Sequence, residues 1–275
     1  MDKRLQHIVE NLDSMKIGVD AAFRFHCTQC GKCCINRDDI LLNSKDLYNL
    51  ARELDMTTQE VIETYCEAYI GDSSRIPIVR LQPRGSIKRC PLLKDRKCSV
   101  HKAKPVVCAM FPIGRCIKVD PDHYHSSGIK DCQIEYIFDN PGCGDNSETH
   151  TVREWFGKFD ISLEDEFFMK WHQTIADVSS FVYKAEKIYT ESILNKVWTL
   201  IYVMLYLNYD TEQAFLPQYI QNAEKLTDML KLLPIKGNRN HAQKQKSTPG
   251  YLQTCENTAI AERDLANERI SSEDN

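Results

Sequence analysis

The most constraining feature of this chain is a run of four cysteines within eight residues, Cys27-Thr-Gln-Cys30-Gly-Lys-Cys33-Cys34. Its two-residue spacers let the backbone turn so that successive thiolates converge, and Gly31 permits the left-handed conformation that such a turn needs. Neighbouring side chains tend to diverge, so binding of one tetrahedral ion by both Cys33 and Cys34 would be strained. One of the two is therefore left for a second metal or for none. The run predicts a metal site.

Further cysteines stand beside prolines, which stiffen the backbone next to each thiol. They lie in Cys90-Pro91, in Cys98-Ser-Val-His101 and in Lys104-Pro105-Val-Val-Cys108-Ala-Met-Phe-Pro112. His101 is an alternative zinc ligand. Of a looser group formed by Cys116, Cys132 and Cys143, Cys132 is the strongest candidate for ligation. Cys66 on the apolar face of an expected helix and Cys255 near the end of the sequence are expected to bind no metal.

The number of cysteines, twelve in 275 residues, matters because the first 18 residues have no continuous apolar segment and no small-residue cleavage site. That pattern predicts a cytoplasmic protein, where thiols stay reduced and a dense cysteine set indicates a metal or redox site. The formal charge of −4 provides no basic field for nucleic acid or for an anionic bilayer. The longest uncharged apolar run, 197–207, is too short to span a membrane and predicts a buried helix.

The pattern along the chain predicts an α+β protein with four regions. Residues 1–19 carry a short amphipathic helix, and 20–150 form an irregular cysteine-rich module of proline-rich loops and short strands at 76–81 and 115–119. A bound metal is expected to hold this module together in place of a large core. Helical periodicity dominates 151–235, where the acidic residues 163–166 are expected to begin a helix. The polar segment 236–275 is expected to be a solvated, disordered tail.

Local signals place several helices. Ser44 is the expected N-cap of a helix over 44–54, and the capping box of Thr57 and Glu60 opens a second helix expected to contain Cys66 and to reach Tyr69. A similar box, Asp210 with Gln213, is expected to open the last helix, which ends near Pro234.

On these motifs the sequence resembles the YkgJ-type cysteine-cluster proteins, whose shared region is described as zinc- or iron-chelating. The resemblance covers about residues 23–160. It rests on Phe25, Cys27, Cys30, Cys33, Cys34, Cys90-Pro91, Cys98, His101, Lys104-Pro105, Cys108 and Phe111-Pro112, with Ile113-Gly114-Arg115 and Val152-Arg153-Glu154-Trp155 typical of members with a longer helical part. The chain departs from the family at Lys104 and Ala109, where many members have arginine.

The expected metal ligands are Cys27, Cys30, Cys33, Cys34, Cys90, Cys98, Cys108 and Cys132. Thiolates suit zinc and iron–sulphur clusters equally, so ligand type does not choose between them. The spacing of Cys27, Cys30 and Cys33 with a remote Cys90-Pro91 matches the outline of a ferredoxin cluster. Flagellin lysine methylases, which are associated with iron–sulphur chemistry, are similar over the same module, and this favours iron slightly over zinc. The thiols outnumber the four that one zinc or one cluster takes, which implies two sites or additional redox-active cysteines.

Three functions remain open on the sequence alone: a metal-binding redox or accessory protein, an enzyme in which the cluster assists group transfer such as lysine N-methylation, and a structural zinc module that binds a protein partner. No phosphate-binding loop, dinucleotide fingerprint, zincin motif or hydrolase elbow occurs in the sequence. His123 and His125 lie among carboxylates and could bind a divalent ion, but a polar hairpin turn is the favoured interpretation. His172 is expected to pack within a helix.

Overall fold

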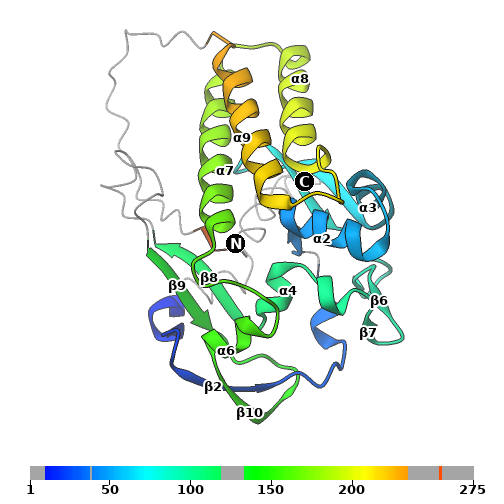
Figure 1. Ribbon diagram of the computed structural model, residues 1–275, viewed down its shortest axis with the longest axis vertical. Helices are drawn as coiled ribbons and strands as arrows, with labels where there is room; N and C mark the ends of the chain where they lie inside the picture. The colour runs from blue at the N-terminus through cyan, green and yellow to red at the C-terminus, as the bar shows by residue number, and fades with distance from the viewer. Residues whose placement is uncertain (1–9, 38, 119–132, 235–253, 256–275) are drawn as a thin grey trace, which may run out of the picture.

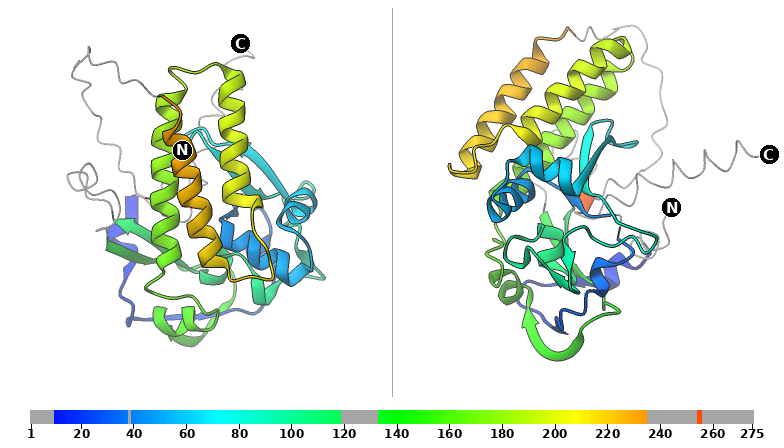
Figure 2. Two further views of the ribbon diagram at one scale, coloured as in Figure 1. Left: turned by 45° about the horizontal axis from the view of Figure 1, so that its top comes forward. Right: turned by 90° about the vertical axis from the view of Figure 1, so that its right-hand side faces the viewer.

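Three long helices form a layer that stands on a lower part made of short strands and short helices (Figures 1 and 2). This computed structural model describes residues 10–37, 39–118, 133–234 and 254–255. The helices of the upper layer are α7 (Glu166–Ala185), α8 (Glu191–Tyr202) and α9 (Phe215–Lys231). The predicted α+β class with a helical C-terminal region is confirmed.

The strands are short, antiparallel and divided among four small sheets. The largest sheet has the order β1 (Lys16–Ile17), β9 (Gln133–Phe138), β8 (Ile113–Lys118) and β11 (Thr254–Cys255). The others pair β2 (Ala22–His26) with β10 (Asp145–Thr151), order β3 (Leu41–Leu42), β5 (Pro77–Leu81) and β4 (Cys66–Ile70), and join β6 (Leu93–Lys94) to β7 (Lys97–Cys98). The strands predicted at 76–81 and 115–119 are therefore β5 and β8.

Short helices connect these strands. Residues 10–15 are helical. The other helices of the lower part are α2 (Ser44–Leu54), α3 (Thr58–Tyr65), α4 (Val106–Met110) and α6 (Val152–Gly157), with the 3₁₀ turns η1 (Lys32–Cys34) and η2 (His101–Ala103). The apolar run 197–207 is buried on one side as predicted, and it continues α8 into a π-helical turn, η3 (Val203–Leu207).

The helix starts follow local side-chain hydrogen bonds, with two corrections. Thr57 caps α3 through the predicted box with Glu60, and Asp165 caps α7 by accepting from the Phe168 N–H. The N-cap of α2 is Asn43 rather than Ser44, because the Asn43 side chain accepts from the third residue of the helix. The side chains of Asp210 and Gln213 do bond to each other, but α9 begins only at Phe215, so they form no capping box.

The helix predicted to run on to Tyr69 stops earlier. α3 ends at Tyr65, and Cys66 begins β4, where it pairs with Leu81 of β5. Five successive pairs with β5 satisfy the backbone groups of this segment, and that long-range pairing overrides the local helical pattern.

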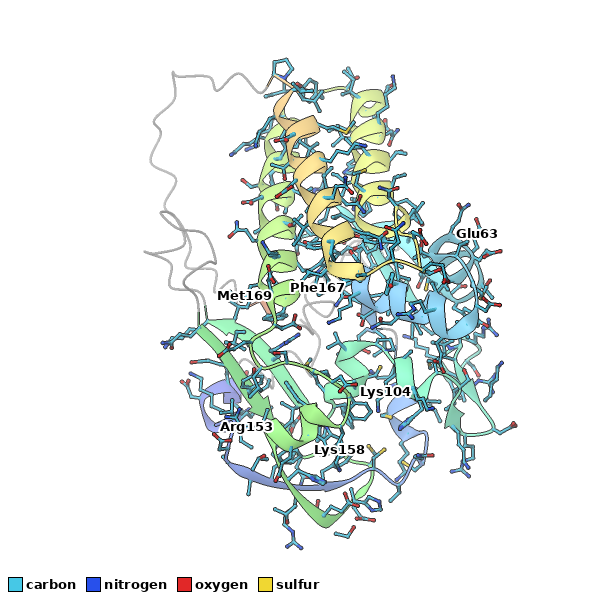
Figure 3. The ribbon with its side chains drawn as sticks, viewed as in Figure 1. Glu63, Lys104, Arg153, Lys158, Phe167 and Met169 are labelled. Carbon is cyan, nitrogen blue, oxygen red and sulfur yellow. The ribbon has the colours of Figure 1, made fainter. Side chains whose placement is uncertain are left out.

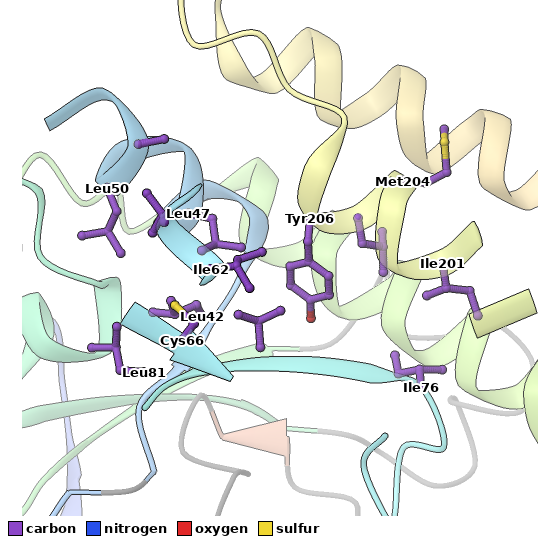
Figure 4. Close-up of a cluster of buried hydrophobic side chains, with 14 of the residues drawn as sticks. Leu42, Leu47, Leu50, Ile62, Cys66, Ile76, Leu81, Ile201, Met204 and Tyr206 are labelled. Carbon is purple, nitrogen blue, oxygen red and sulfur yellow. The ribbon is translucent and has the colours of Figure 1, made fainter. Parts of the chain in front are cut away.

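The main hydrophobic core is shared between the lower part and the helical layer. Figure 4 shows Leu47 and Leu50 from α2, with Cys66 and Leu81 from the β4–β5 pair, on one side, and Ile201, Met204 and Tyr206 from α8 and η3 on the other. Polar contacts cross the same boundary: the Ser44 hydroxyl donates to the Leu205 carbonyl, and the Trp198 indole donates to the Arg75 carbonyl at 2.9 Å. The helical layer therefore fixes the position of α2 and of the sheet beneath it.

Parts of the chain for which the sequence makes predictions lie outside the described residues. Of the segment 236–275, the structure describes only β11, which pairs with β8. His123, His125 and Cys132 lie outside the described residues. Within the described ranges, no helix is both long enough and apolar enough to cross a membrane.

Candidate metal centre

The cysteine run folds into a tight turn that brings two adjacent thiols together. Gly31 precedes η1 with a φ of +73°, and a Cβ at this position would lie only 3.2 Å from the Arg96 carbonyl oxygen. The Sγ atoms of Cys33 and Cys34 are 3.9 Å apart. That is close to the edge of about 3.8 Å expected for a tetrahedron with zinc–sulphur bonds of about 2.3 Å. The two thiols therefore meet rather than diverge as expected.

Main-chain hydrogen bonds bring the second group of cysteines to this turn. The Cys90 N–H donates to the Cys34 carbonyl at 2.8 Å. The turn that follows returns as the β6–β7 hairpin, in which Leu93 pairs with Cys98. Two segments that are more than fifty residues apart in the sequence are thereby joined at the cysteines themselves.

Cys108 is presented by α4, and α2 holds the start of this short helix. The Asp46 side chain closes the capping box of α2 with one carboxylate oxygen and accepts from the Val106 N–H at 2.8 Å with the other. The Cys108 N–H in turn donates to the Pro105 carbonyl at 2.8 Å. A carboxylate that is 4% exposed therefore positions the third cysteine segment.

The thiols converge on one cavity of about 80 Å³, which we call the thiol pocket. Its lining combines six cysteines with one histidine: Cys27, Cys33, Cys34, Cys90, Cys98, Cys108 and His101. Arg37 and Lys104 also line it. Six of the eight cysteines predicted as ligands thus come together from separate parts of the chain.

The surroundings lower the pKa of one pocket thiol and raise the pKa of four others. A hydrogen bond from the Cys34 thiol, together with the positive charges of Arg37 and Lys104, lowers the pKa of Cys33. The same hydrogen bond, together with burial, raises the pKa of Cys34. Burial likewise raises the pKa of the other thiols at the back of the pocket, Cys90, Cys98 and Cys108. Buried thiols of this kind become thiolates when a cation compensates the lost hydration, as a bound metal ion does.

The donor chemistry fits zinc and iron, since several thiols and one imidazole are ligands that both metals take in proteins. Among the described residues, no three histidine, cysteine or acidic side chains are already arranged as a site that could hold a metal ion. The fit therefore rests on the kind of donors and on their shared pocket.

Cys30 and Cys143 lie beside the thiol pocket rather than in its lining. Cys30 accepts a hydrogen bond from the Lys32 N–H, the main cause of its lowered pKa, and another from the Gly144 N–H. Cys143 is close enough to Cys33, Cys30 and Cys27 for each of the three to raise its pKa, after a larger effect of burial, to about 11.

The position of Cys143 follows from strand pairing that the local sequence does not signal. β10 pairs with β2 so that Asp145 faces His26, and this brings residues 143–144 alongside the beginning of the cysteine run. Gly144 approaches so closely that a Cβ there would lie 2.4 Å from the His26 carbonyl oxygen. The sequence gives one indication of this close approach, a glycine on each side of Cys143.

Two other cysteines are excluded from the pocket. Cys66 packs in the shared core, where burial raises its pKa to about 12, and it does not line the thiol pocket. Cys116 is 1% exposed and disulfide-bonded, a state that was not predicted for any cysteine of this chain.

Aromatic residues pack beside the segments that carry the pocket cysteines. Phe25 is 2% exposed and meets Phe111 and Trp155 edge-on, with ring centroids 6.1 Å and 5.5 Å away. The Trp155 indole donates to the Met110 carbonyl at 3.0 Å. These contacts tie β2, α4 and α6 together and so hold both ends of the cysteine set.

Comparison with known proteins identifies the same region. Residues 26–133 match the CxxCxxCC family, described as a "Putative zinc- or iron-chelating domain". The uncharacterized protein MJ0661 of Methanocaldococcus jannaschii is 29% identical over 93 residues, which are 32% of this chain and 44% of that protein. The match therefore spans less than half of the relative. No solved structure matches the chain.

Proposed function

We propose that this chain, which carries a CxxCxxCC domain at residues 26–133, binds zinc or iron in its thiol pocket. The observation that carries the proposal is that six thiols from distant segments line one cavity beside an imidazole. Thiols and an imidazole around one cavity are the donors that zinc and iron take in proteins. The family description supports the same chemistry.

The proposed ligands are five of the pocket thiols, with two earlier cysteines of the run as further ligands. The first set is Cys33, Cys34, Cys90, Cys98 and Cys108, and the second is Cys27 and Cys30. Cys132, which lies outside the described residues, stays a candidate.

Between the two metals we favour iron, held as an iron–sulphur cluster. Cys27, Cys33 and Cys90 of the ferredoxin-like outline line the same cavity, and this spacing supports a cluster. A cluster of this kind suits a redox or accessory role in the cytoplasm. Lysine methylation and partner binding around a structural zinc remain the alternative functions.

Elemental analysis of protein purified without oxygen tests the proposal. We expect iron and acid-labile sulphide near four each per chain, with a broad absorption band near about 400 nm. One or two zinc ions without colour would keep the metal site and replace the cluster by a structural centre. Protein that stays metal-free after growth with both metals and reconstitution would contradict the proposal.

A matched pair of alanine variants tests the site itself. Cys90→Ala removes a pocket thiol that is bonded through its backbone to the cysteine turn, so metal content is expected to fall to less than about half. Cys66→Ala removes a buried thiol from the shared core and is expected to keep the full content. Equal metal content in the two variants would refute the assignment of Cys90.

A further inference from the structure

A second cavity lies between the helical layer and the cysteine-rich part, on the other side of α4 from the thiol pocket. Its volume is about 470 Å³, within the range of about 300–1,000 Å³ usual for small-molecule sites. Val106 and Ala109 of α4 face this interlayer cavity, whereas Val107 and Cys108 face the thiol pocket. Lys104 lines both. One short helix therefore forms the wall between the two.

The walls come from elements that are distant in sequence. α2 supplies a polar face, η2 and the residues after it supply lysines, and the beginning of α7 supplies aromatic rings. Figure 3 labels Phe167 at the foot of α7 and Lys104 below it, and both residues line the cavity. The aromatic lining consists of Phe159, Phe167, Phe168 and Trp171.

Some charges in the cavity wall already serve the fold. Asp46 uses both carboxylate oxygens on backbone N–H groups. Asp165 caps α7 with one oxygen and accepts from the Arg115 guanidinium at 3.2 Å with the other. Arg115, 2% exposed, also stacks on Phe168 with 3.8 Å between the guanidinium carbon and the ring centroid. These groups are committed to structural contacts.

The remaining charges are mainly positive. In the part of the chain that the structure describes, no carboxylate lies within 4 Å of the cations Lys45, Arg52, Lys102 and Lys104. Glu53 and Asp160 are the wall carboxylates that, among the described residues, form no salt bridge and accept no backbone N–H, whereas Asp46 accepts two backbone N–H groups. Lys45 and Lys104 are held over aromatic rings instead, 6.0 Å from the Phe167 centroid and 4.1 Å from the Phe159 centroid. Four cations beside flat apolar walls favour an anion with a flat body.

We propose that the interlayer cavity binds a small organic anion, one that carries a phosphate or carboxylate group on a flat, ring-shaped body. The anionic group lies among Lys45, Arg52 and Lys102, and the ring packs against the aromatic residues at the foot of α7. Lys104, shared with the thiol pocket, places this ligand directly next to the cysteines.

Calorimetric titration of the full chain, as purified, tests the inference with two pairs of probes. Adenosine monophosphate and benzoate carry the anion and the ring, whereas adenosine and benzamide carry the ring alone. We expect at least one of the two anions to saturate a single site below about 10 mM and its neutral counterpart to bind at least about tenfold more weakly. Trp171 lines the cavity, so the anion is also expected to change tryptophan fluorescence.

Variants with matched charge locate the site. The double variant Lys45→Gln/Arg52→Gln is expected to weaken binding at least about tenfold. The exposed pair Lys187→Gln/Lys196→Gln on the helical layer removes the same charge and is expected to change binding less than about twofold. Lys45, Arg52 and Lys102 are all exposed, and Lys102→Gln, which removes a single charge, is expected to give a milder loss and serves if the double variant does not fold.

Three results would overturn the inference. They are no saturable binding of either anion up to about 10 mM, equal binding of the neutral probes, and equal loss in the cavity variants and the distant pair. Metal content and thermal unfolding temperature are measured on every variant, so that failure of the metal site is distinguished from failure of the cavity.

Discussion

At the scale of single residues, Cys143 adds a thiol to the candidate centre from outside the family-matched region. It lies beyond residue 133, where the match ends, yet Cys33, Cys30 and Cys27 all act on its pKa. The loop that carries it also donates the Gly144 N–H to Cys30. Cys143 therefore lies near the beginning of the cysteine run.

We expect Cys143→Ala to lower metal affinity about tenfold or more, because one thiolate ligand or its immediate support is lost. The measurement is competition with a chelator of known affinity, compared with Cys66→Ala. An affinity equal to that of the unaltered protein would restrict the ligands to the family-matched segment.

The sequence predicted which cysteines line the thiol pocket better than it predicted the contacts between them. Six of the predicted thiols share one pocket, because their spacing and adjacent prolines are local signals. The approach of Cys143 depends on the pairing of β2 with β10, which no local pattern encodes. The 3.9 Å approach of the Cys33 and Cys34 Sγ atoms was not predicted either, because adjacent side chains ordinarily point apart.

At the scale of elements, the Asp46 side chain links α2 to α4, two helices for which the sequence predicts no contact. The same carboxylate completes the N-terminal cap of α2 and holds the Val106 N–H at the beginning of α4. Helix positions were predictable from caps and periodicity, as for α3 and α7, but this bond across sixty residues was not. β4 shows the same limit, since pairing with β5 decided its conformation.

We expect Asp46→Ala to destabilise the fold by about 2 kcal/mol or more, because a buried acceptor of two backbone N–H groups is lost. The control is Glu60→Ala in the exposed capping box of α3, which is expected to cost about 0.5–1 kcal/mol. Urea unfolding gives both values. The Asp46 variant is also expected to retain less metal, since Cys108 lies two residues after Val106. Equal destabilisation would mean that the link to α4 contributes nothing.

At the scale of the whole molecule, the cysteine-rich part and the helical layer meet at a buried group of charges and rings. Arg115 of β8 pairs with Asp165 and stacks on Phe168 of α7. His172, one turn later, bonds its Nδ1 to the Phe168 carbonyl at 2.8 Å. Burial lowers the pKa of His172 to about 4. The residue therefore packs within a helix, as the sequence predicted.

This junction makes stability depend on pH. An unfolded histidine takes up its proton near pH 6.5, whereas folded His172 resists protonation until about pH 4. The contribution is complete above pH 6.5, falls as the pH decreases, and amounts to a loss on the order of 2 kcal/mol near pH 4. We expect His172→Gln to be less stable at pH 7 but to lose less stability between pH 6.5 and 4.5. Urea unfolding at both pH values measures this, and a parallel decline in both proteins would contradict it.

Residues 20–150 and 151–235, which the sequence pattern divides into two regions, share one hydrophobic core. Leu47 and Leu50 of α2 pack in one cluster with Ile201 of α8 and Leu226 of α9. Periodicity marks where helices begin and end, but it does not tell which segments bury their apolar faces against one another. That information lies in the three-dimensional arrangement alone.

The thin wall formed by α4 has a thermodynamic consequence. The five residues of α4 form the wall between the thiol pocket and the interlayer cavity, and Lys104 lines both. Two occupants on opposite faces of so short a helix are coupled through its position and through one shared charge. Linkage requires this coupling to be reciprocal, so any factor by which the first changes the affinity of the second applies equally in return. The coupling measured by titration on one side of α4 is therefore the same coupling that acts on the other side.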